Sequence, residues 1–385
     1  MKISKNSQSI EPSLSRRLFN MAKQYDDVID LTLGDPDIKP SNIIRESGSE
    51  AIMSGNTKYS ANAGIFELRK AIADNIREEY GISVNPETEI TVTVGGMEAL
   101  FLSISCLVDS GDEVIILAPY YVNYKQMVNM CSGVPVIINT SESSGFTVSA
   151  EQLENAVTDR TVAIIINTPC NPTGTVLNRD SLEAIAEISK KYNLTVISDE
   201  VYRTLIFDGK EHQSILNLPG MRERTILIDS LSKRFAMTGY RLGYAVGPEV
   251  FTSNLVKMQE NVAACAPVPS QFAGVAAFKD CKNDTFIRDE FELRRNYIYD
   301  ALKSVEGLSC VKPAATFYMF VNIESTGLDS LAFAEKLLKE QHVAVVPGIT
   351  YGQAYNNYIR IAFTVKIDLL KKAVEKIDEF MKQFR

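Results

Sequence analysis

Residues 161–202 read TVAIIINTPCNPTGTVLNRDSLEAIAEISKKYNLTVISDEVY, and this stretch indicates the fold class. Apolar runs at 161–166 and 194–198 have the length and composition of buried strands. The stretch between them has the period of an amphipathic helix, with apolar positions at Leu182, Ile185, Ala186 and Ile188. Apolar strands that alternate with such helices are typical of a parallel sheet covered on both faces.

The same order of elements recurs on both sides of this stretch. We predict further strands at 90–94, 114–117, 225–228 and 244–246, and a helix at 97–108. Because parallel sheets bind ligands at the carboxyl ends of their strands, polar residues just after the strands are the candidates for chemistry. They are Gly95, Gly96, Asn171, Asp199 and the segment from Ser230 to Lys233.

After about residue 285 the pattern changes to that of a smaller α+β unit. Strands are predicted at 317–321, 343–346 and 358–363. The last helix has a clear helical period, with apolar positions at Leu370, Ala373, Val374, Ile377 and Met381.

The chain has 385 residues, which is too long for one simple core and indicates two domains. We predict an α/β fold whose mostly parallel central sheet has helices on both faces, together with a smaller α+β domain. The larger domain is expected to span residues 45–288. The smaller one is expected to combine residues 1–44 with residues 289–385.

The composition argues against several classes of protein. The formal net charge is −8 at pH 7, a poor match to nucleic acid, because binding there depends on neutralising phosphates. The six cysteines include no Cys-x-x-Cys pair, so neither a zinc site nor a disulfide framework is predicted. Residues 1–17 lack the apolar core of a signal peptide, and no apolar run is long enough to span a membrane. We therefore expect a cytoplasmic protein without nucleic-acid, membrane or metal partners.

The segment DSLSKRFAMTGYR at 229–241 carries the most chemical information. Lys233 can form a Schiff base with a carbonyl cofactor, because burial near other cations lowers a lysine pKa and frees the amine. Ser230, Ser232 and Arg241 can hold a phosphate, to which a guanidinium offers two donors. A surface loop of serine and lysine is the alternative for this segment taken alone.

Two more polar segments follow strands. Asp199 ends an apolar run, and a carboxylate against a pyridine nitrogen keeps that nitrogen protonated, so the ring withdraws electrons. Tyr202 and Asn171, the latter in a rigid turn at 167–174, can donate hydrogen bonds to a phenolate oxygen of the same cofactor. The alternatives are a helix N-cap for Asp199 and a plain tight turn for 167–174.

Three other features can contribute to a site. Gly95 and Gly96 precede a predicted helix and allow its backbone N–H groups to approach an anion. Tyr121 can stack on an aromatic ring, although a core tyrosine is the alternative. Arg360 lies on a predicted half-buried strand and needs a partner, either a substrate carboxylate or an internal salt bridge.

Together these segments resemble the class I/II aminotransferases of the fold type I pyridoxal-phosphate-dependent family, in the bacterial aspartate aminotransferase-like branch. The resemblance runs from about Leu31 to Arg360. It is carried by LGDPD at 33–37, KYSANAG at 58–64, NPTG at 171–174, SDEVY at 198–202 and S-x-S-K-x-x-A-M-T-G-x-R at 230–241. All of these motifs in this order make a specific match.

The resemblance implies a set of roles. Pyridoxal 5′-phosphate would be held covalently by Lys233, with Asp199 at its ring nitrogen and Tyr202 at its phenolate oxygen, and these three are the predicted catalytic residues. Further cofactor contacts are expected from Gly95, Gly96, Met97, Tyr121, Asn171, Ser230, Ser232 and Arg241. Arg360 would bind the α-carboxylate of the substrate, with help from Asn171 and the backbone of Gly34. Tyr59 would reach the phosphate bound by a partner subunit, which implies a homodimer.

The predicted function follows from the same resemblance. The enzyme is expected to move the amino group of an L-amino acid to a 2-oxo acid by a ping-pong mechanism. The expected acceptor is 2-oxoglutarate. Met97 stands where close aspartate-specific relatives often have a lysine, so aspartate, alanine and aromatic donors all stay open. The alternative is a pyridoxal-phosphate-dependent carbon–sulfur β-lyase on the same fold. An acyl-serine hydrolase is not favoured, because the chain lacks the Ser-Asp-Asn and Lys-Thr-Gly strings that accompany Ser-x-x-Lys.

Overall fold

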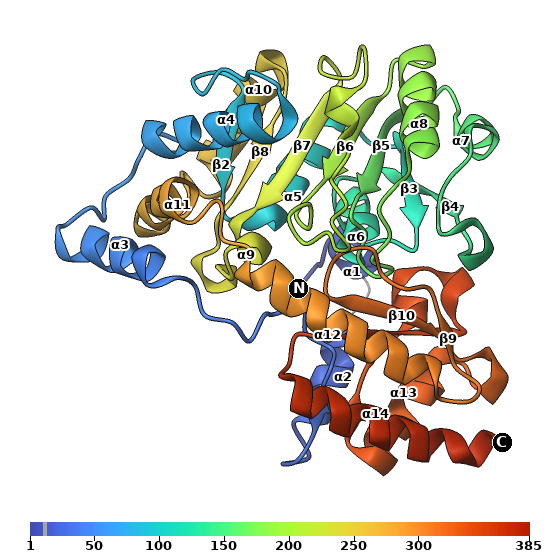
Figure 1. Cartoon of the computed structure of the whole chain (residues 1–385). Coiled ribbons are helices and arrows are strands. Elements are labelled where there is room, and N and C mark those ends of the chain that lie inside the picture. The colour runs from blue at the N-terminus through green and yellow to red at the C-terminus, as the bar shows by residue number, and fades with distance from the viewer. Residues whose placement is uncertain (11–13) are drawn as a thin grey trace.

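The computed structural model of the chain describes residues 1–10 and 14–385. Its largest sheet has seven strands in the order β2-β8-β7-β6-β5-β3-β4 (Figure 1). Their bounds are β2 Ile90–Thr93, β3 Glu113–Ala118, β4 Val134–Asn139, β5 Thr161–Asn167, β6 Thr195–Asp199, β7 Thr225–Ser230 and β8 Gly243–Val246. Strands β7, β6, β5, β3 and β4 run parallel to one another, whereas β8 is antiparallel to both of its neighbours, β7 and β2. The predicted α/β class with a mostly parallel central sheet is confirmed.

The register of this sheet brings the predicted polar residues together. Asn167 of β5 is paired with Asp199 of β6, and Asp199 is paired with Ile228 of β7. The carboxyl ends of these three strands therefore meet at one edge. The segments that follow them, including the turn with Asn171 and the segment with Lys233, start from neighbouring points.

Helices cover both faces of this sheet, which explains why its strands are continuously apolar. Successive side chains of a strand point to opposite faces. Accordingly, Ile164 packs in one core with Ile185, while Ile165 packs in another core with Leu100. The helices of this larger unit are α3 Asn42–Met53, α4 Phe66–Tyr80, α5 Gly95–Leu107, α6 Asn123–Met130, α7 Ala150–Ala156, α8 Arg179–Lys191, α9 Leu231–Arg234, α10 Glu249–Val262 and α11 Val268–Asp280.

A smaller unit lies against the edge where the polar residues gather. Its antiparallel sheet has the order β12-β13-β10-β9, and a separate pair joins β1 to β11. The strands are β1 Ile29–Asp30, β9 Ser309–Cys310, β10 Tyr318–Asn322, β11 Val343–Ala344, β12 Val346–Pro347 and β13 Tyr358–Ala362. The helices are α2 Leu14–Ala22, α12 Phe286–Lys303, α13 Ser330–Gln341 and α14 Ile367–Met381, while α1 Lys5–Ser9 begins the chain. Figure 1 shows this unit below the seven-stranded sheet.

One predicted strand of the smaller unit is wrong. The apolar run 343–346 forms two short strands in two different sheets rather than one strand. Val343 pairs with Ile29 near the N-terminus, whereas Val346 pairs with Arg360 of β13. The run divides because its partner strands come from distant parts of the chain, which an apolar pattern does not reveal.

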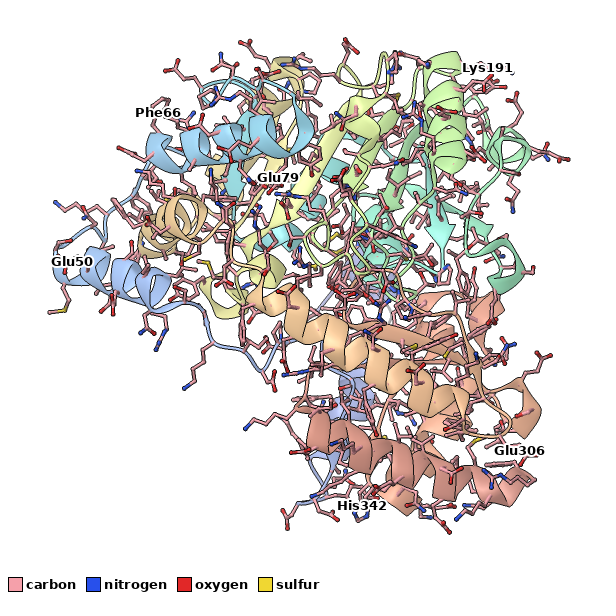
Figure 2. The ribbon with its side chains drawn as sticks, viewed as in Figure 1. Glu50, Phe66, Glu79, Lys191, Glu306 and His342 are labelled. Carbon is pink, nitrogen blue, oxygen red and sulfur yellow. The ribbon has the colours of Figure 1, made fainter. Side chains whose placement is uncertain are left out.

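The N-terminal chain contributes to the core of the smaller unit. Leu18 and Leu31 lie in one buried cluster with Phe317, Ile361 and Leu370. In Figure 2, Phe66 and Lys191 lie at the outer edge of the larger unit, and Glu306 and His342 lie at the outer edge of the smaller one. The domain limits at residues 45 and 288 stay a prediction. No helix in the described ranges is long and apolar enough to cross a membrane.

Candidate active site

A cavity of about 480 Å³ lies at the carboxyl ends of β5, β6 and β7, with part of its wall from the smaller unit. The predicted site residues in its wall are Gly34, Gly96, Met97, Tyr121, Asn171, Asp199, Tyr202, Ser230, Ser232, Lys233, Arg241 and Arg360. Gly95 lies directly before Gly96 at the start of α5 but is not part of the wall. Tyr59 is also outside the wall, and 87% of its surface is exposed.

Lys233 projects into this cavity from α9, the short helix directly after β7. Its Nζ donates a hydrogen bond to the carbonyl oxygen of Gly34, 2.6 Å away. Burial lowers the pKa of this amine to about 8, an effect that Arg360 and Arg241 reinforce and Asp35 opposes. About a tenth of Lys233 is therefore uncharged at pH 7, far more than for an ordinary lysine, and the uncharged amine is the form that reacts with a carbonyl group.

Asp199 is the last residue of β6 and is buried. Its Oδ2 accepts a hydrogen bond from the hydroxyl of Tyr124 at 2.5 Å, and its Oδ1 accepts one from the Val201 backbone at 3.3 Å. Burial raises the pKa of Asp199 to about 6, although the Tyr124 bond acts in the opposite direction. Most of this carboxylate is ionised at pH 7, so the cavity wall carries a negative charge with a defined orientation.

The wall also offers donors for an anion. Ser230 caps α9, where its Oγ accepts the Ser232 backbone N–H at 3.2 Å. A side chain at Gly95, whose φ is +76°, would place its Cβ 2.8 Å from Nη2 of Arg241. Glycine at this position is therefore what lets the guanidinium approach the N-terminus of α5. A cation, a helix N-terminus and two hydroxyls at one place fit a phosphate.

A buried hydrogen-bonded cluster of Asp229, Arg203 and Tyr244 holds the backbone of Ser230 in place. Oδ1 of Asp229 accepts the Ser230 backbone N–H at 2.6 Å. Its Oδ2 accepts hydrogen bonds from Arg203 Nε at 2.9 Å and from the Tyr244 hydroxyl at 2.7 Å. With both oxygens engaged, this carboxylate is paired as buried charges require, and the turn that leads into Lys233 is rigid.

Arg360 reaches the cavity from β13 with 6% of its surface exposed. Its Nη1 donates to Oδ1 of Asn171 at 3.1 Å, and its Nη2 donates to the carbonyl oxygen of Thr32 at 2.5 Å. Both partners are neutral, so these contacts do not form the internal salt bridge that was the alternative. The Nε of Arg360 is buried and has no hydrogen-bond partner in the part of the chain that the structure describes. The guanidinium thus keeps an unmet need for an anion.

Comparison with known sequences identifies the family of the chain. The family profile described as "Aminotransferase class I and II" matches residues 26–377. The chain belongs to this aminotransferase family. The resemblance predicted from the motifs is confirmed, and the protein is an enzyme that transfers amino groups between small molecules.

Several full-length relatives belong to this aminotransferase family. The chain is 39% identical to the aspartate aminotransferase of Pyrococcus abyssi over 97% of each sequence. It is 38% identical to the aromatic-amino-acid aminotransferase 2 of Thermococcus litoralis over 100% of this chain and 99% of that one. The crystal structure of the aromatic aminotransferase from Pyrococcus horikoshii superposes with a TM-score of 0.90 at 40% identity, covering 95% of this chain and 99% of that one.

Sequence reasoning missed several residues of this aminotransferase cavity. Tyr318, Tyr351, Asp35 and Asn123 all contribute to its wall. Tyr318 is the first residue of β10, within an apolar and aromatic run that reads as core. Aromatic residues in such runs are indistinguishable from ordinary core residues until the partner strand and the cavity are known.

The Tyr124–Asp199 contact gives a testable pH effect. A hydrogen bond to the ionised carboxylate lowers its pKa, so Tyr124→Phe should raise the pKa of Asp199 above about 6. In the protein without cofactor, the midpoint of the Asp199 titration should therefore move upward by roughly 0.5–1 pH unit. Carboxyl ¹³C NMR of the protein without cofactor measures the same shift directly.

Tyr355→Phe serves as the matched control for Tyr124→Phe. The hydroxyl of Tyr355 is also buried, but its single hydrogen faces the backbone oxygens of Ala118 at 2.6 Å and Thr140 at 2.8 Å rather than a carboxylate. This variant should lose stability without moving the titration midpoint of Asp199. A titration midpoint that stays in place in Tyr124→Phe would show that the hydroxyl does not control the pKa of Asp199.

Proposed function

We propose that the protein is a pyridoxal-phosphate-dependent aminotransferase that carries its cofactor on Lys233. The observation that carries this proposal is the reactive amine of Lys233 in one cavity with a buried carboxylate, an anion-binding set and Arg360. These four features match the aldehyde, ring nitrogen and phosphate of the cofactor and the α-carboxylate of an amino acid. Family membership supports the same assignment.

Each end of the cofactor has candidate residues. Asp199 would hold a proton on the ring nitrogen, and Tyr121 would stack on the ring. The amide oxygen of Asn171 is taken by Arg360, which leaves its amide nitrogen to donate, with the hydroxyl of Tyr202, to the ring oxygen. The phosphate would be bound by Ser230, Ser232 and Arg241 together with the backbone at Gly95, Gly96 and Met97.

The mechanism follows from these positions. The bound cofactor supplies an electron-withdrawing ring that stabilises negative charge at the substrate Cα. Arg360 binds the α-carboxylate and thereby orients the Cα–H bond relative to Lys233. Lys233 would hold the aldehyde of the cofactor, and its Nζ would be the base that takes the proton from the substrate Cα and the acid that returns it. Asp199, as a carboxylate, would hold the proton on the ring nitrogen.

The proposed reaction has two halves. In the first half, an L-amino acid (aspartate, alanine or an aromatic one) would leave its amino group on the enzyme and depart as its 2-oxo acid. A second oxo acid, 2-oxoglutarate, then takes up the amino group in a ping-pong sequence. The exposed Tyr59 is proposed to reach the phosphate bound by a second copy of the chain, so that the active enzyme is a homodimer.

A donor screen tests this function. The purified protein, loaded with pyridoxal phosphate, is incubated with 2-oxoglutarate and each of the common L-amino acids, and glutamate formation is measured. Glutamate formation with parallel double-reciprocal plots supports the proposal. Release of pyruvate and ammonia from a cysteine conjugate, without glutamate formation, would instead indicate the carbon–sulfur β-lyase.

A further inference from the structure

Tyr318 contacts two proposed site residues that have different tasks. Its ring lies beneath the guanidinium of Arg360, whose Cζ is 4.2 Å from the ring centroid. Its hydroxyl oxygen lies 3.2 Å from the hydroxyl oxygen of Tyr202, and the two rings meet edge to face at 76°. Only 3% of its surface is exposed, so both contacts are shielded from water.

The sheet of the smaller unit sets the position of Tyr318. In the register of β10 and β13, Tyr318 is opposite Ala362, and Phe320 is opposite Arg360. Tyr318 and Phe320 point to the same face, so Tyr318 and Arg360 are diagonal neighbours on that face. Such neighbours are within reach when one side chain is aromatic and the other is long. The contact between ring and guanidinium is therefore built into the sheet.

A third contact places Tyr318 against the N-terminal loop. A Cβ added to Gly34 would lie 1.8 Å from the hydroxyl oxygen of Tyr318, so only glycine leaves room for this hydroxyl. The carbonyl oxygen of the same glycine accepts the hydrogen bond from Lys233. Tyr318 thus packs at the point where the loop, the predicted catalytic lysine and the carboxylate-binding arginine meet.

The two hydroxyls of Tyr318 and Tyr202 impose a direction on their hydrogen bond. A phenol has one hydrogen to donate. If Tyr202 donates its hydrogen to the ring oxygen of the cofactor, Tyr318 must be the donor in the bond between the two tyrosines. Such a donor polarises the hydroxyl of Tyr202 and makes it a stronger donor in turn. Tyr121 and Arg360 also face Tyr202, and the substitution Tyr318→Phe alters neither of these two side chains.

We propose that Tyr318 is a positioning residue with two separable parts. Its ring holds Arg360 in the orientation that receives the substrate α-carboxylate. Its hydroxyl donates to Tyr202 and directs the hydroxyl of that residue to the ring oxygen of the cofactor. This inference rests on the proposed function, because it assigns Arg360 and Tyr202 to substrate and cofactor.

Two substitutions in the cofactor-loaded enzyme separate the two parts. Tyr318→Phe keeps the ring and removes the hydroxyl, whereas Tyr318→Leu removes both. The pH titration of the cofactor absorbance reports on the Tyr202 contact. The KM for amino donors, together with the Kd of 3-phenylpropionate by calorimetry, reports on Arg360. Tyr192→Leu, at the exposed end of α8 and outside the cavity, is the control.

The expected results differ between the variants. Tyr318→Phe should move the absorbance midpoint upward by about 0.5 pH unit, because the deprotonated ring oxygen loses stabilisation. Its KM and Kd should stay within about 2-fold of the wild type, since the ring is retained. Tyr318→Leu should shift the midpoint as well and should raise both KM and Kd about 10-fold. Tyr192→Leu should change none of these values.

Each part of the proposal can be overturned. An unchanged midpoint in Tyr318→Phe removes the hydroxyl role, and an unchanged Kd in Tyr318→Leu removes the ring role. If Tyr318→Leu does not fold, Tyr318→Met replaces it, because methionine adapts to irregular core space. A wild-type enzyme that binds no pyridoxal phosphate overturns the proposed function itself, a result distinct from either of these.

Discussion

Replacement of Lys233 by alanine is expected to abolish amino transfer, with kcat reduced by at least about 10³-fold. The proposed mechanism uses this amine twice, once to hold the cofactor and once to carry the Cα proton. Burial lowers the pKa of Lys233 to about 8, and among the described residues Lys233 is the lysine that lines the cavity. The near-ultraviolet and visible absorption band of the bound cofactor should also disappear in the variant after dialysis.

Lys257→Ala is the matched control for this experiment. Lys257 is exposed on α10, and its Nζ contacts Oδ1 of Asn254 at 3.2 Å, outside the cavity. This variant should keep both the absorption band and the wild-type turnover. If the band and the turnover also survive in Lys233→Ala, another group holds the cofactor and the assignment is wrong.

Asp199→Asn is expected to leave the cofactor bound but to lower kcat by about 10²- to 10³-fold. Asparagine has nearly the same shape and still accepts the hydrogen bond from Tyr124, so the cavity should keep its form. What it lacks is the negative charge that is proposed to keep the ring nitrogen protonated, on which electron withdrawal would depend. The phosphate donors are untouched, and equilibrium dialysis should therefore find cofactor affinity reduced much less than turnover.

Glu200→Gln is a demanding control because it changes the adjacent carboxylate, which is equally buried. The oxygens of Glu200 accept hydrogen bonds from Tyr80, Ser198 and Ser214, and one of them also contacts His212. Glu200 is not part of the cavity wall. The control should destabilise the fold by about 1–3 kcal/mol, measured by chemical denaturation, while kcat changes only a few-fold. Unaltered turnover in Asp199→Asn would refute the electronic role of Asp199.

Much of the fold can be read from local pattern. The continuous apolar runs predict a buried parallel sheet, since a strand covered on both faces needs apolar residues at every position. The carboxyl ends of such strands share one edge, which is why Asp199, Asn171 and Lys233 can be expected to lie close together before any coordinates are known. The motifs around these residues lead to the family that the comparisons confirm. The individual roles of the site residues stay predictions that the variants above test.

Other features depend on contacts between segments that are far apart in the chain. The run 343–346 divides between two sheets because its partners are residue 29 and residue 360. Tyr318 belongs to the site because the register of β10 and β13 places it beside Arg360, and because Gly34 leaves space for its hydroxyl. Local pattern reports whether a side chain is buried, but not against which partner it is buried. The pKa values of Lys233 and Asp199 are set in the same way, since desolvation and neighbouring charges exist only once the chain has folded.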